Sequence, residues 1–237
     1  MKHHLKYILL TGILFIGLQA SAQFGVRLKY NSSDFPNFNK HFNTEFGGNP
    51  KVFGSGVEAG VDYWFKLKKR RIEFMPELAF SYASTSLNIQ GLDKVSLTGY
   101  HFNFHTNIYA LDLEDDCNCP TFSKQGASFN KGLFFHFTPG LGYYTTKSTF
   151  VDQQEYSLEV KDIVFRAGVG IGLDLGVSDL LTLTPILSYY FHSKMNWNYP
   201  PGTGDLPPYN VADNQKLLQL TLRLGFRPDY TSGRRYR

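Results

Sequence analysis

The segment DIVFRAGVGIGLDLGV (Asp162–Val177) decides the fold. Every second residue from Ile163 to Val177 is apolar, while the residues between them are charged or glycine, except for Val164. An alternation of period two is the pattern of a β-strand with one apolar and one polar face. The stretch is long for a strand of a soluble protein and fits a tilted strand that crosses a bilayer.

Seven further runs show the same alternation, and no segment shows helical periodicity. In chain order, the runs occupy residues 24–30, 57–65, 72–82, 100–108, 133–143, 181–191 and 218–226. The runs at 72–82, 133–143 and 181–191 share the motif Pro-x-Leu-x-aromatic, which begins at Pro76, Pro139 and Pro185. Because proline cannot donate to a ladder, we expect an irregularity at each of them.

The connections between the runs alternate in length. Long polar loops are predicted at residues 31–53, 83–94, 145–161 and 192–215, and tight turns at 66–71 and 178–179. Long loops on one side and short turns on the other predict an all-β fold, a closed eight-stranded antiparallel transmembrane β-barrel with long outer loops. A ten-stranded barrel remains open if residues 31–53 contain an extra hairpin.

A soluble lipocalin-like barrel is the structural alternative, with its apolar residues facing inward. The unbroken apolar faces and the glycine-rich opposite faces favour the membrane barrel. Composition excludes coiled coils and disordered chains, because 16% of the residues are aromatic and only 19% are charged.

The first 22 residues predict a secretory signal peptide. A basic start with Lys2 and Lys6 precedes an apolar run, and Ala20-Ser-Ala22 forms a cleavage site before Gln23. Residues 23–237 then form the barrel domain, located in the outer membrane, with a periplasmic insert at about 113–131. Removal of the leader lowers the formal net charge from +4 to +2, which gives no argument for nucleic acid as a partner.

The polar faces place charges of both signs inside the barrel. An eight-stranded barrel has an interior just wide enough for side chains, so these charges are predicted to form a lumen ion network that plugs it. The network comprises Arg27, Lys29, Glu58, Asp62, Glu73, Glu77, Arg166 and Arg223, and Asp162 and Asp174 also fall on the polar faces.

Histidines and one serine on the predicted strands are weak candidates for a metal site or a catalytic site. His101 and His105 lie about 13 Å apart on one strand face, so they do not ligate one metal together, although His136 can approach His105. His192-Ser193 near the outer rim defines no triad by spacing. We therefore expect no catalytic residues, no metal and no cofactor.

Two segments outside the strands are candidate interaction sites. The insert carries Cys117, Asn118, Cys119, Pro120 and Phe122. We expect no disulfide between Cys117 and Cys119, because cysteines two residues apart would close a cramped ring. The outer loop 192–215 is rich in proline and aromatic residues, and we expect Trp197, Tyr199 and Tyr209 to form a recognition surface there.

The leader that ends in Ala-Ser-Ala-Gln, the Pro-x-Leu-x-aromatic strands and the glycine-rich strand at 168–176 resemble the PorT-type outer-membrane β-barrel proteins of the Bacteroidota. The resemblance covers the mature chain and implies an eight-stranded barrel, and some members are components of the type IX secretion and gliding machinery. The Cys117 insert departs from the short turn usual in the family.

On this basis, the sequence predicts a non-enzymatic scaffold or accessory subunit of an outer-membrane complex. Its expected partners are outer-membrane lipid and other outer-membrane or periplasmic proteins. A lipid-modifying enzyme, and a small-solute channel or surface-binding barrel, remain alternatives.

Overall fold

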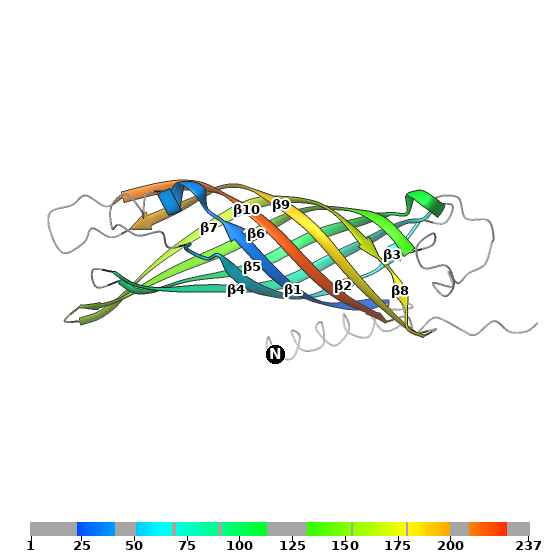
Figure 1. The fold of residues 1–237 in the computed structure, drawn as a ribbon, viewed down its shortest axis with the longest axis horizontal. Helices are drawn as coiled ribbons and strands as arrows, with labels where there is room; N and C mark the ends of the chain where they lie inside the picture. The colour runs from blue at the N-terminus through cyan, green and yellow to red at the C-terminus, as the bar shows by residue number, and fades with distance from the viewer. Residues whose placement is uncertain are drawn as a thin grey trace, which may run out of the picture.

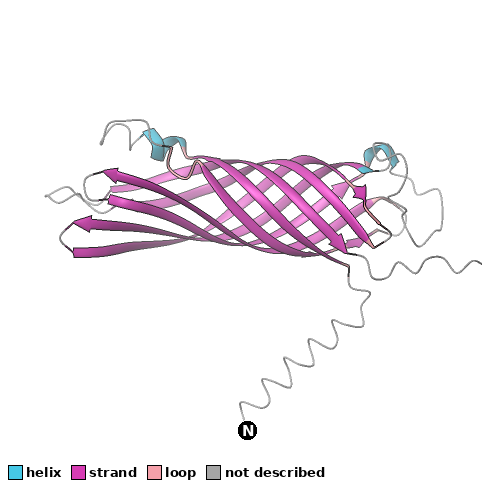
Figure 2. Ribbon diagram, turned by 60° about the horizontal axis from the view of Figure 1, so that its bottom comes forward, coloured by secondary structure: helices cyan, strands magenta, loops and turns pink. Residues whose placement is uncertain are grey.

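The chain forms a closed β-barrel whose strands run obliquely to its axis (Figures 1 and 2). This computed structural model describes residues 23–40, 51–67, 70–89, 92–112, 132–152, 154–178, 180–199 and 209–226. Among these residues, none of the helical segments has the length and apolar character of a transmembrane helix.

Eight long antiparallel strands make up the described wall. They are β1 (Phe24–Asp34), β2 (Ser55–Tyr63) continued by β3 (Phe65–Lys66), β4 (Ile72–Ile89), β5 (Leu92–Ile108), β6 (Leu133–Asp152), β7 (Gln154–Leu173) continued by β8 (Leu175–Gly176), β9 (Leu181–Tyr199) and β10 (Tyr209–Phe226). Each pairs with its neighbours in the chain, and β10 pairs with both β9 and β1, which closes the sheet. A short 3-10 helix, η1 (Ala110–Asp112), follows β5.

The two ends of the barrel differ. The proximal end, at the right in Figure 1, carries the start of β1 and the end of β10. The distal end carries the β4–β5, β6–β7 and β9–β10 connections, together with a helical turn at residues 36–40.

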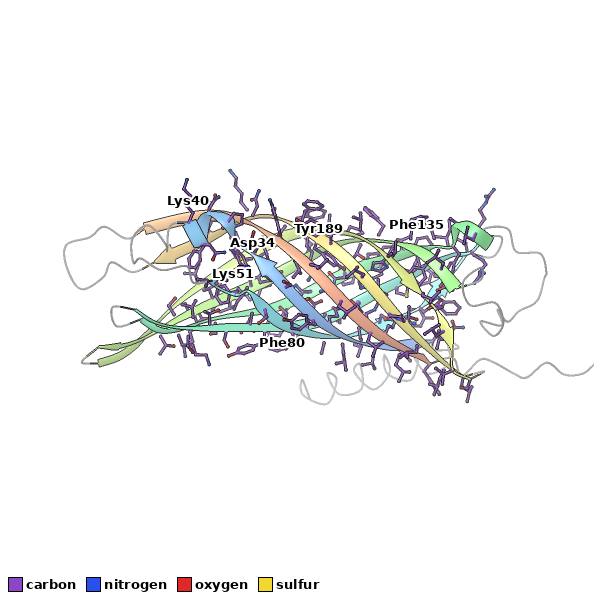
Figure 3. The ribbon with its side chains drawn as sticks, viewed as in Figure 1. Asp34, Lys40, Lys51, Phe80, Phe135 and Tyr189 are labelled. Atoms are coloured by element: carbon purple, nitrogen blue, oxygen red, sulfur yellow. The ribbon has the colours of Figure 1, made fainter. Side chains whose placement is uncertain are left out.

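The outer surface of the barrel is apolar around its middle, as the side chains projecting from the wall in Figure 3 illustrate. Leu78 is 65% exposed and Ile163 is 70% exposed, and every long strand contributes further exposed apolar side chains. Soluble proteins rarely expose apolar patches of this extent, whereas lipid solvates them. The prediction of a transmembrane eight-stranded barrel is therefore confirmed, and the lipocalin-like alternative is wrong because the apolar faces point outward.

Aromatic side chains border this band at two levels. The distal girdle contains Tyr82, Tyr100, Tyr143, Phe165 and Phe191, and the proximal girdle contains Phe24, Tyr63, Phe65, Phe74, Phe104 and Phe135. Phe135 and Tyr143 lie eight residues apart on β6, which is about 20 Å along the axis at the usual strand tilt. That height is close to the apolar band of a transmembrane barrel, which is about 25 Å tall.

The long outer loops predicted at 83–94, 145–161 and 192–215 are wrong over most of their length. The structure continues β4 and β5, β6 and β7, and β9 and β10 through these residues, so that β6 and β7 pair as far as Asp152 and Gln154. Beyond the bilayer, neither face has to be apolar, so the alternation fades while the backbone ladder continues. The described part of 31–53 holds the helical turn and not an extra hairpin.

Each of the three prolines within the long strands interrupts one ladder without shifting its register. At Pro76, the pairing of β2 with β4 stops at Asp62–Glu77 and resumes as β3 at Phe65–Phe74 in the same register. Similar gaps lie beside Pro139 and Pro185. The irregularity is a missing donor, as expected for proline, and not a bulge.

Candidate functional site

The middle of the barrel interior is filled by paired charges, beginning with a carboxylate held between two guanidinium groups. Arg27 Nε donates to Asp62 Oδ2 at 2.6 Å. Arg223 Nε donates to the same oxygen at 2.8 Å, and its Nη2 donates to Oδ1 at 2.7 Å. The bidentate pair with Arg223 fixes the orientation of the carboxylate, because fork-shaped contacts are directional.

A second group of ion pairs adjoins the first. Lys29 Nζ donates to Glu58 Oε1 at 2.6 Å and to Glu77 Oε2 at 2.7 Å. Arg166 Nη1 donates to Glu58 Oε2 at 3.3 Å, and its guanidinium lies 4.5 Å from the centre of the Tyr190 ring. The structure thus connects Lys29 and Arg166 through one carboxylate.

Buried charges balance in number from the proximal end to the middle of the described lumen. Five cations and five anions are buried there: Arg27, Lys29, Arg71, Arg166, Arg223, Glu58, Asp62, Glu73, Glu77 and Asp174. A sixth buried carboxylate, Asp213, lies apart from them at the distal cap. Removing a charge from water costs free energy, and only oppositely charged partners and hydrogen bonds offset that cost in a buried site. The balanced interior satisfies that requirement, and the removal of one member leaves an uncompensated buried charge.

Histidines extend this network through hydrogen bonds. His105 Nε2 lies 2.8 Å from Glu77 Oε2, and His105 Nδ1 lies 3.2 Å from His136 Nε2. His136 Nδ1 lies 2.6 Å from Asn107 Oδ1, and the His101 ring bonds to Ser81. Among the described residues, no group of three or more histidine, cysteine or acidic side chains could hold a metal ion.

A separate cluster closes the proximal end. The Tyr109 hydroxyl oxygen lies 2.9 Å from Glu73 Oε2 and also within hydrogen-bond distance of the Asp174 carboxylate. The Arg71 guanidinium lies 4.5 Å from the centre of the Tyr109 ring, and Phe134 packs on the same ring. This cluster stabilises the part of the barrel wall that precedes residues 113–131 in the chain.

An apolar cap fills the distal end. It comprises Phe35, Phe38, Val52 and Phe53 from the segment between β1 and β2, packed on Val95, Leu97, Tyr144, Val164 and Met195. Sequence reasoning missed this cap, because it treated 31–53 as a polar loop. Asp213, beyond the apolar band, accepts a hydrogen bond from Phe38 N at 2.8 Å, and burial raises the pKa of Asp213.

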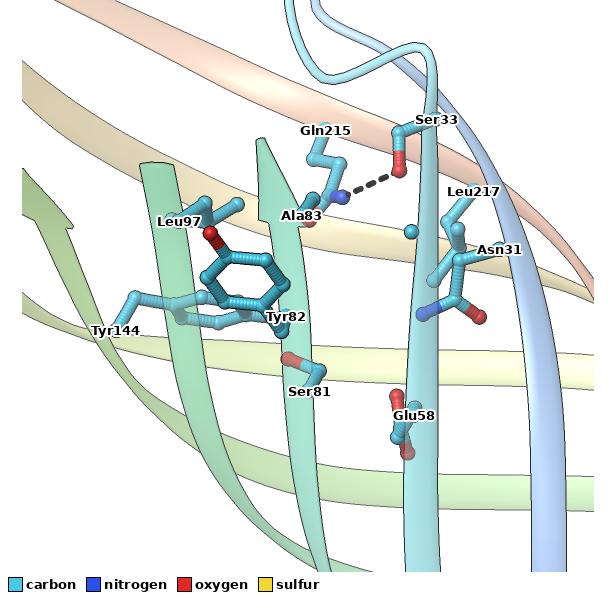
Figure 4. Close-up of a pocket in the computed structure, with 11 residues that line it drawn as sticks. Asn31, Ser33, Glu58, Ser81, Tyr82, Ala83, Leu97, Tyr144, Gln215 and Leu217 are labelled. Atoms are coloured by element: carbon cyan, nitrogen blue, oxygen red, sulfur yellow. Dashed lines mark hydrogen bonds between the residues drawn. The ribbon is translucent and has the colours of Figure 1, made fainter. Parts of the chain in front are cut away.

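Between the cap and the ion network lies a small cavity of about 20 Å³ (Figure 4). Glu58, Ser81 and Tyr144 line it from the walls, and Gln215 donates across one side to Ser33 Oγ at 3.0 Å. This volume holds about one water molecule. This cavity therefore offers space for water and not for a solute.

Several sequence candidates do not come together as a site. His192 is buried, whereas Ser193 is exposed and accepts a hydrogen bond from Phe165 N at 3.0 Å, because consecutive strand residues point to opposite faces. The three residues of the predicted recognition loop stand on strands: Trp197 and Tyr199 belong to β9 and Tyr209 to β10, and Tyr199 pairs with Tyr209. Their part in recognition stays a prediction. Cys117, Asn118, Cys119, Pro120 and Phe122 lie outside the described residues.

Some members of the network were not selected from the sequence. Asn103 donates to Glu77 Oε2 at 2.7 Å, and Gln219 Nε2 donates to Asn31 Oδ1 at 2.8 Å. Both fall on the polar faces of their strands, so the alternation alone was enough to place them inside. Tyr109 lies just past the end of β5, where the alternation gives no guidance.

No family model matches the chain, and no curated protein matches its sequence. Among solved structures, it is similar to Neisserial surface protein A (NspA), with a TM-score of 0.45 and 8% identity over 88% of this chain and 97% of that chain. It is also similar to Ail, the attachment invasion locus protein of Yersinia pestis (TM-score 0.42, 12% identity, 86% and 97% covered). A major outer membrane protein from Thermus thermophilus gives a TM-score of 0.45 and 11% identity, with 86% and 99% covered. Identities this low carry no information on function.

Proposed function

We propose that this chain is an integral outer-membrane β-barrel that acts as a non-enzymatic scaffold or accessory subunit of an outer-membrane complex. The observation that carries the proposal is the filled interior, with paired charges in the middle and a cap of side chains at each end. A barrel closed in this way offers its outer wall and its two ends to other molecules. The proximal end, with its tight turns, faces the periplasm, and the distal end faces outward.

The two alternative functions fit the interior less well. A small-solute channel needs a continuous polar path, whereas the described lumen is occupied by side chains. A lipid-modifying enzyme built on His192 and Ser193 needs both side chains at one site, whereas they lie on opposite sides of the wall.

The proximal end is the proposed contact with periplasmic partners. The insert at 113–131 leaves the barrel beside Tyr109, whose backbone N–H donates to Arg71 O at 3.2 Å. It returns at Gly132, whose carbonyl accepts from Asp174 N at 3.0 Å. The residues on both sides of the insert are thus hydrogen-bonded to the rim of the barrel. This arrangement suits a segment that binds a partner and holds it against the barrel. The resemblance to PorT-type proteins suggests that the complex belongs to type IX secretion or gliding machinery.

Purification from native outer membranes in mild detergent tests the proposal. We expect stoichiometric protein partners with the wild-type barrel, identified by mass spectrometry, and a mature chain that begins at Gln23. Deletion of residues 117–128 is expected to release these partners. Deletion of residues 200–208, at the opposite end, serves as the matched control and is expected to retain them.

The outcomes separate the parts of the proposal. A wild-type barrel that emerges alone under the mildest extraction contradicts the scaffold. Partners that are lost only with residues 200–208 support a complex but place its contact at the distal end. A difference in lipid A between cells with and without the protein favours the enzyme instead.

A further inference from the structure

Three lysines on neighbouring strands form a row on the distal outer wall. This lysine row consists of Lys94 on β5, Lys147 on β6 and Lys161 on β7, and all three side chains point away from the lumen. Lys94 pairs with Thr149, two residues from Lys147, and Lys161 pairs with Thr145, two residues from Lys147 on the other side. The lysines are therefore diagonal neighbours, each about 7–8 Å from the next.

The row runs level with the membrane, as a comparison with the distal girdle shows. From β4 to β5 the girdle passes from Tyr82 to Tyr100, which lies two residues below the partner of Tyr82. From β6 to β7 it passes from Tyr143 to Phe165, again two residues below the paired position. An aromatic girdle marks one depth of the bilayer. From β5 to β6 the girdle stays at one paired position, Tyr100 opposite Tyr143, whereas the lysine row descends by two residues at each step. Lys147 and Lys161 therefore lie four residues above the girdle and Lys94 lies six above it, so the row is level to within about 5 Å along the axis.

That height corresponds to lipid headgroups. Lys147 lies four residues above Tyr143 on β6, which is about 10 Å along the axis at the usual strand tilt. Long lysine side chains bend back toward the interface, which brings their ammonium groups closer to the girdle. Polar headgroups occupy this zone just outside the hydrocarbon core.

The surface around the row is basic and rich in hydroxyl groups. Among the described side chains of β5, β6 and β7 above the girdle, one carboxylate faces outward: Glu159, whose Oε1 lies 3.3 Å from Lys161 Nζ. Both partners are more than half exposed, so this pair holds Lys161 weakly. Lys94 interacts with the hydroxyl of Tyr82, and Ser96 and Thr98 lie beside it on β5.

We propose that the lysine row binds the phosphate groups of lipid headgroups in the leaflet at the distal end. Ammonium groups are point-charge ligands for phosphate, and hydroxyl groups nearby supply additional donors. Each lysine near a charged membrane surface contributes roughly a five-fold gain in affinity, so the row is expected to contribute up to about 100-fold. The proposal goes beyond the scaffold function, since it requires only that the apolar band lies in a bilayer.

Native mass spectrometry of the purified barrel in neutral detergent provides the test. The probes are bisphosphorylated lipid A, the same lipid without phosphates, and inorganic phosphate. The row variant combines Lys94→Gln, Lys147→Gln and Lys161→Gln. The control combines Lys40→Gln, Lys51→Gln and Arg70→Gln, which removes the same charge from exposed positions away from the row (Figure 3 labels Lys40 and Lys51). The heat-dependent gel shift of folded barrels verifies that each variant is folded.

Wild-type protein is expected to bind the phosphorylated lipid at least tenfold more tightly than the dephosphorylated lipid. The row variant is expected to lose about 10- to 100-fold in affinity, while the control changes by less than about twofold. Equal affinities for the two lipids, or equal binding by wild-type and a folded row variant, overturn the proposal. Inorganic phosphate that binds the row as tightly as the lipid overturns the assignment to a lipid headgroup. The lipid-binding test uses the purified barrel alone. Its result therefore does not depend on whether the purification described under the proposed function yields protein partners.

Discussion

Lys29 on β1 and Glu77 on β4 meet across the strand that separates them, with Lys29 Nζ 2.7 Å from Glu77 Oε2. The intervening strand β2 places Gly60 on its lumenal face at this level, and a Cβ there would collide with the Glu77 carboxylate. The ion pair therefore depends on a missing side chain. Glycines on the polar faces make room for long charged side chains from neighbouring strands.

Gly60→Leu is expected to disrupt the barrel by overpacking the ion network, at a cost of about 3 kcal/mol or more in unfolding free energy. Ala59→Leu is the matched control, because Ala59 faces outward on the same strand and lipid accepts a larger apolar group. Urea-induced unfolding in lipid vesicles measures both. Equal stability of the two variants would show that Gly60 does not limit packing.

Glu77→Leu is expected to destabilise the barrel by about 3–5 kcal/mol, because Lys29 loses one of its two carboxylate partners while it stays buried. The double variant with Lys29→Met should recover part of this loss, since both buried charges then disappear. Glu159→Gln breaks an exposed pair and is expected to cost less than about 1 kcal/mol. The same vesicle unfolding assay compares them, and a Glu77→Leu effect no larger than that of Glu159→Gln would contradict the network as a source of stability.

Leu222→Arg should cost about 2–4 kcal/mol in vesicle-folded protein, because this side chain lies on the lipid face near the middle of the apolar band. The same change at Thr145, above the distal girdle, is expected to cost about 1 kcal/mol or less. In detergent-free buffer, neither variant should become a soluble folded monomer. Similar costs at the two positions would contradict the assigned depth.

The wild-type barrel is expected to show no stable single-channel conductance in planar bilayers. Replacement of residues 35–54 by a short glycine-serine turn removes the apolar cap but leaves the ion pairs of Asp62 and Glu58 in place. We therefore expect this variant to stay closed as well. Steady ohmic conductance of the wild-type protein would refute a filled lumen. Conductance of the variant alone would show that the apolar cap, and not the ion network, blocks the lumen.

The eight strands were predictable where they cross the bilayer and not beyond it. Between the girdles, lipid on one side and packed charges on the other impose opposite polarities, so residues 162–177 alternate strictly. Past the distal girdle, the two faces of each strand meet water or the apolar cap. Residues 209–215 at the start of β10 were therefore predicted as loop, although this part of the strand pairs with β9. The candidate site divides in the same way: the alternation places Arg27 and Asp62 inside, but their contact depends on register.

By itself, the sequence determined which residues share one face of each strand and which share the other, because a period of two leaves each strand only two orientations. It also determined that both signs of charge share one side of the sheet. Only the tertiary structure decided that the apolar faces point outward, that Lys29 reaches Glu77 over Gly60, and that the segment after β1 caps the distal end. These relationships depend on strand stagger and on side chains from distant parts of the chain, and a local pattern of polarity contains neither.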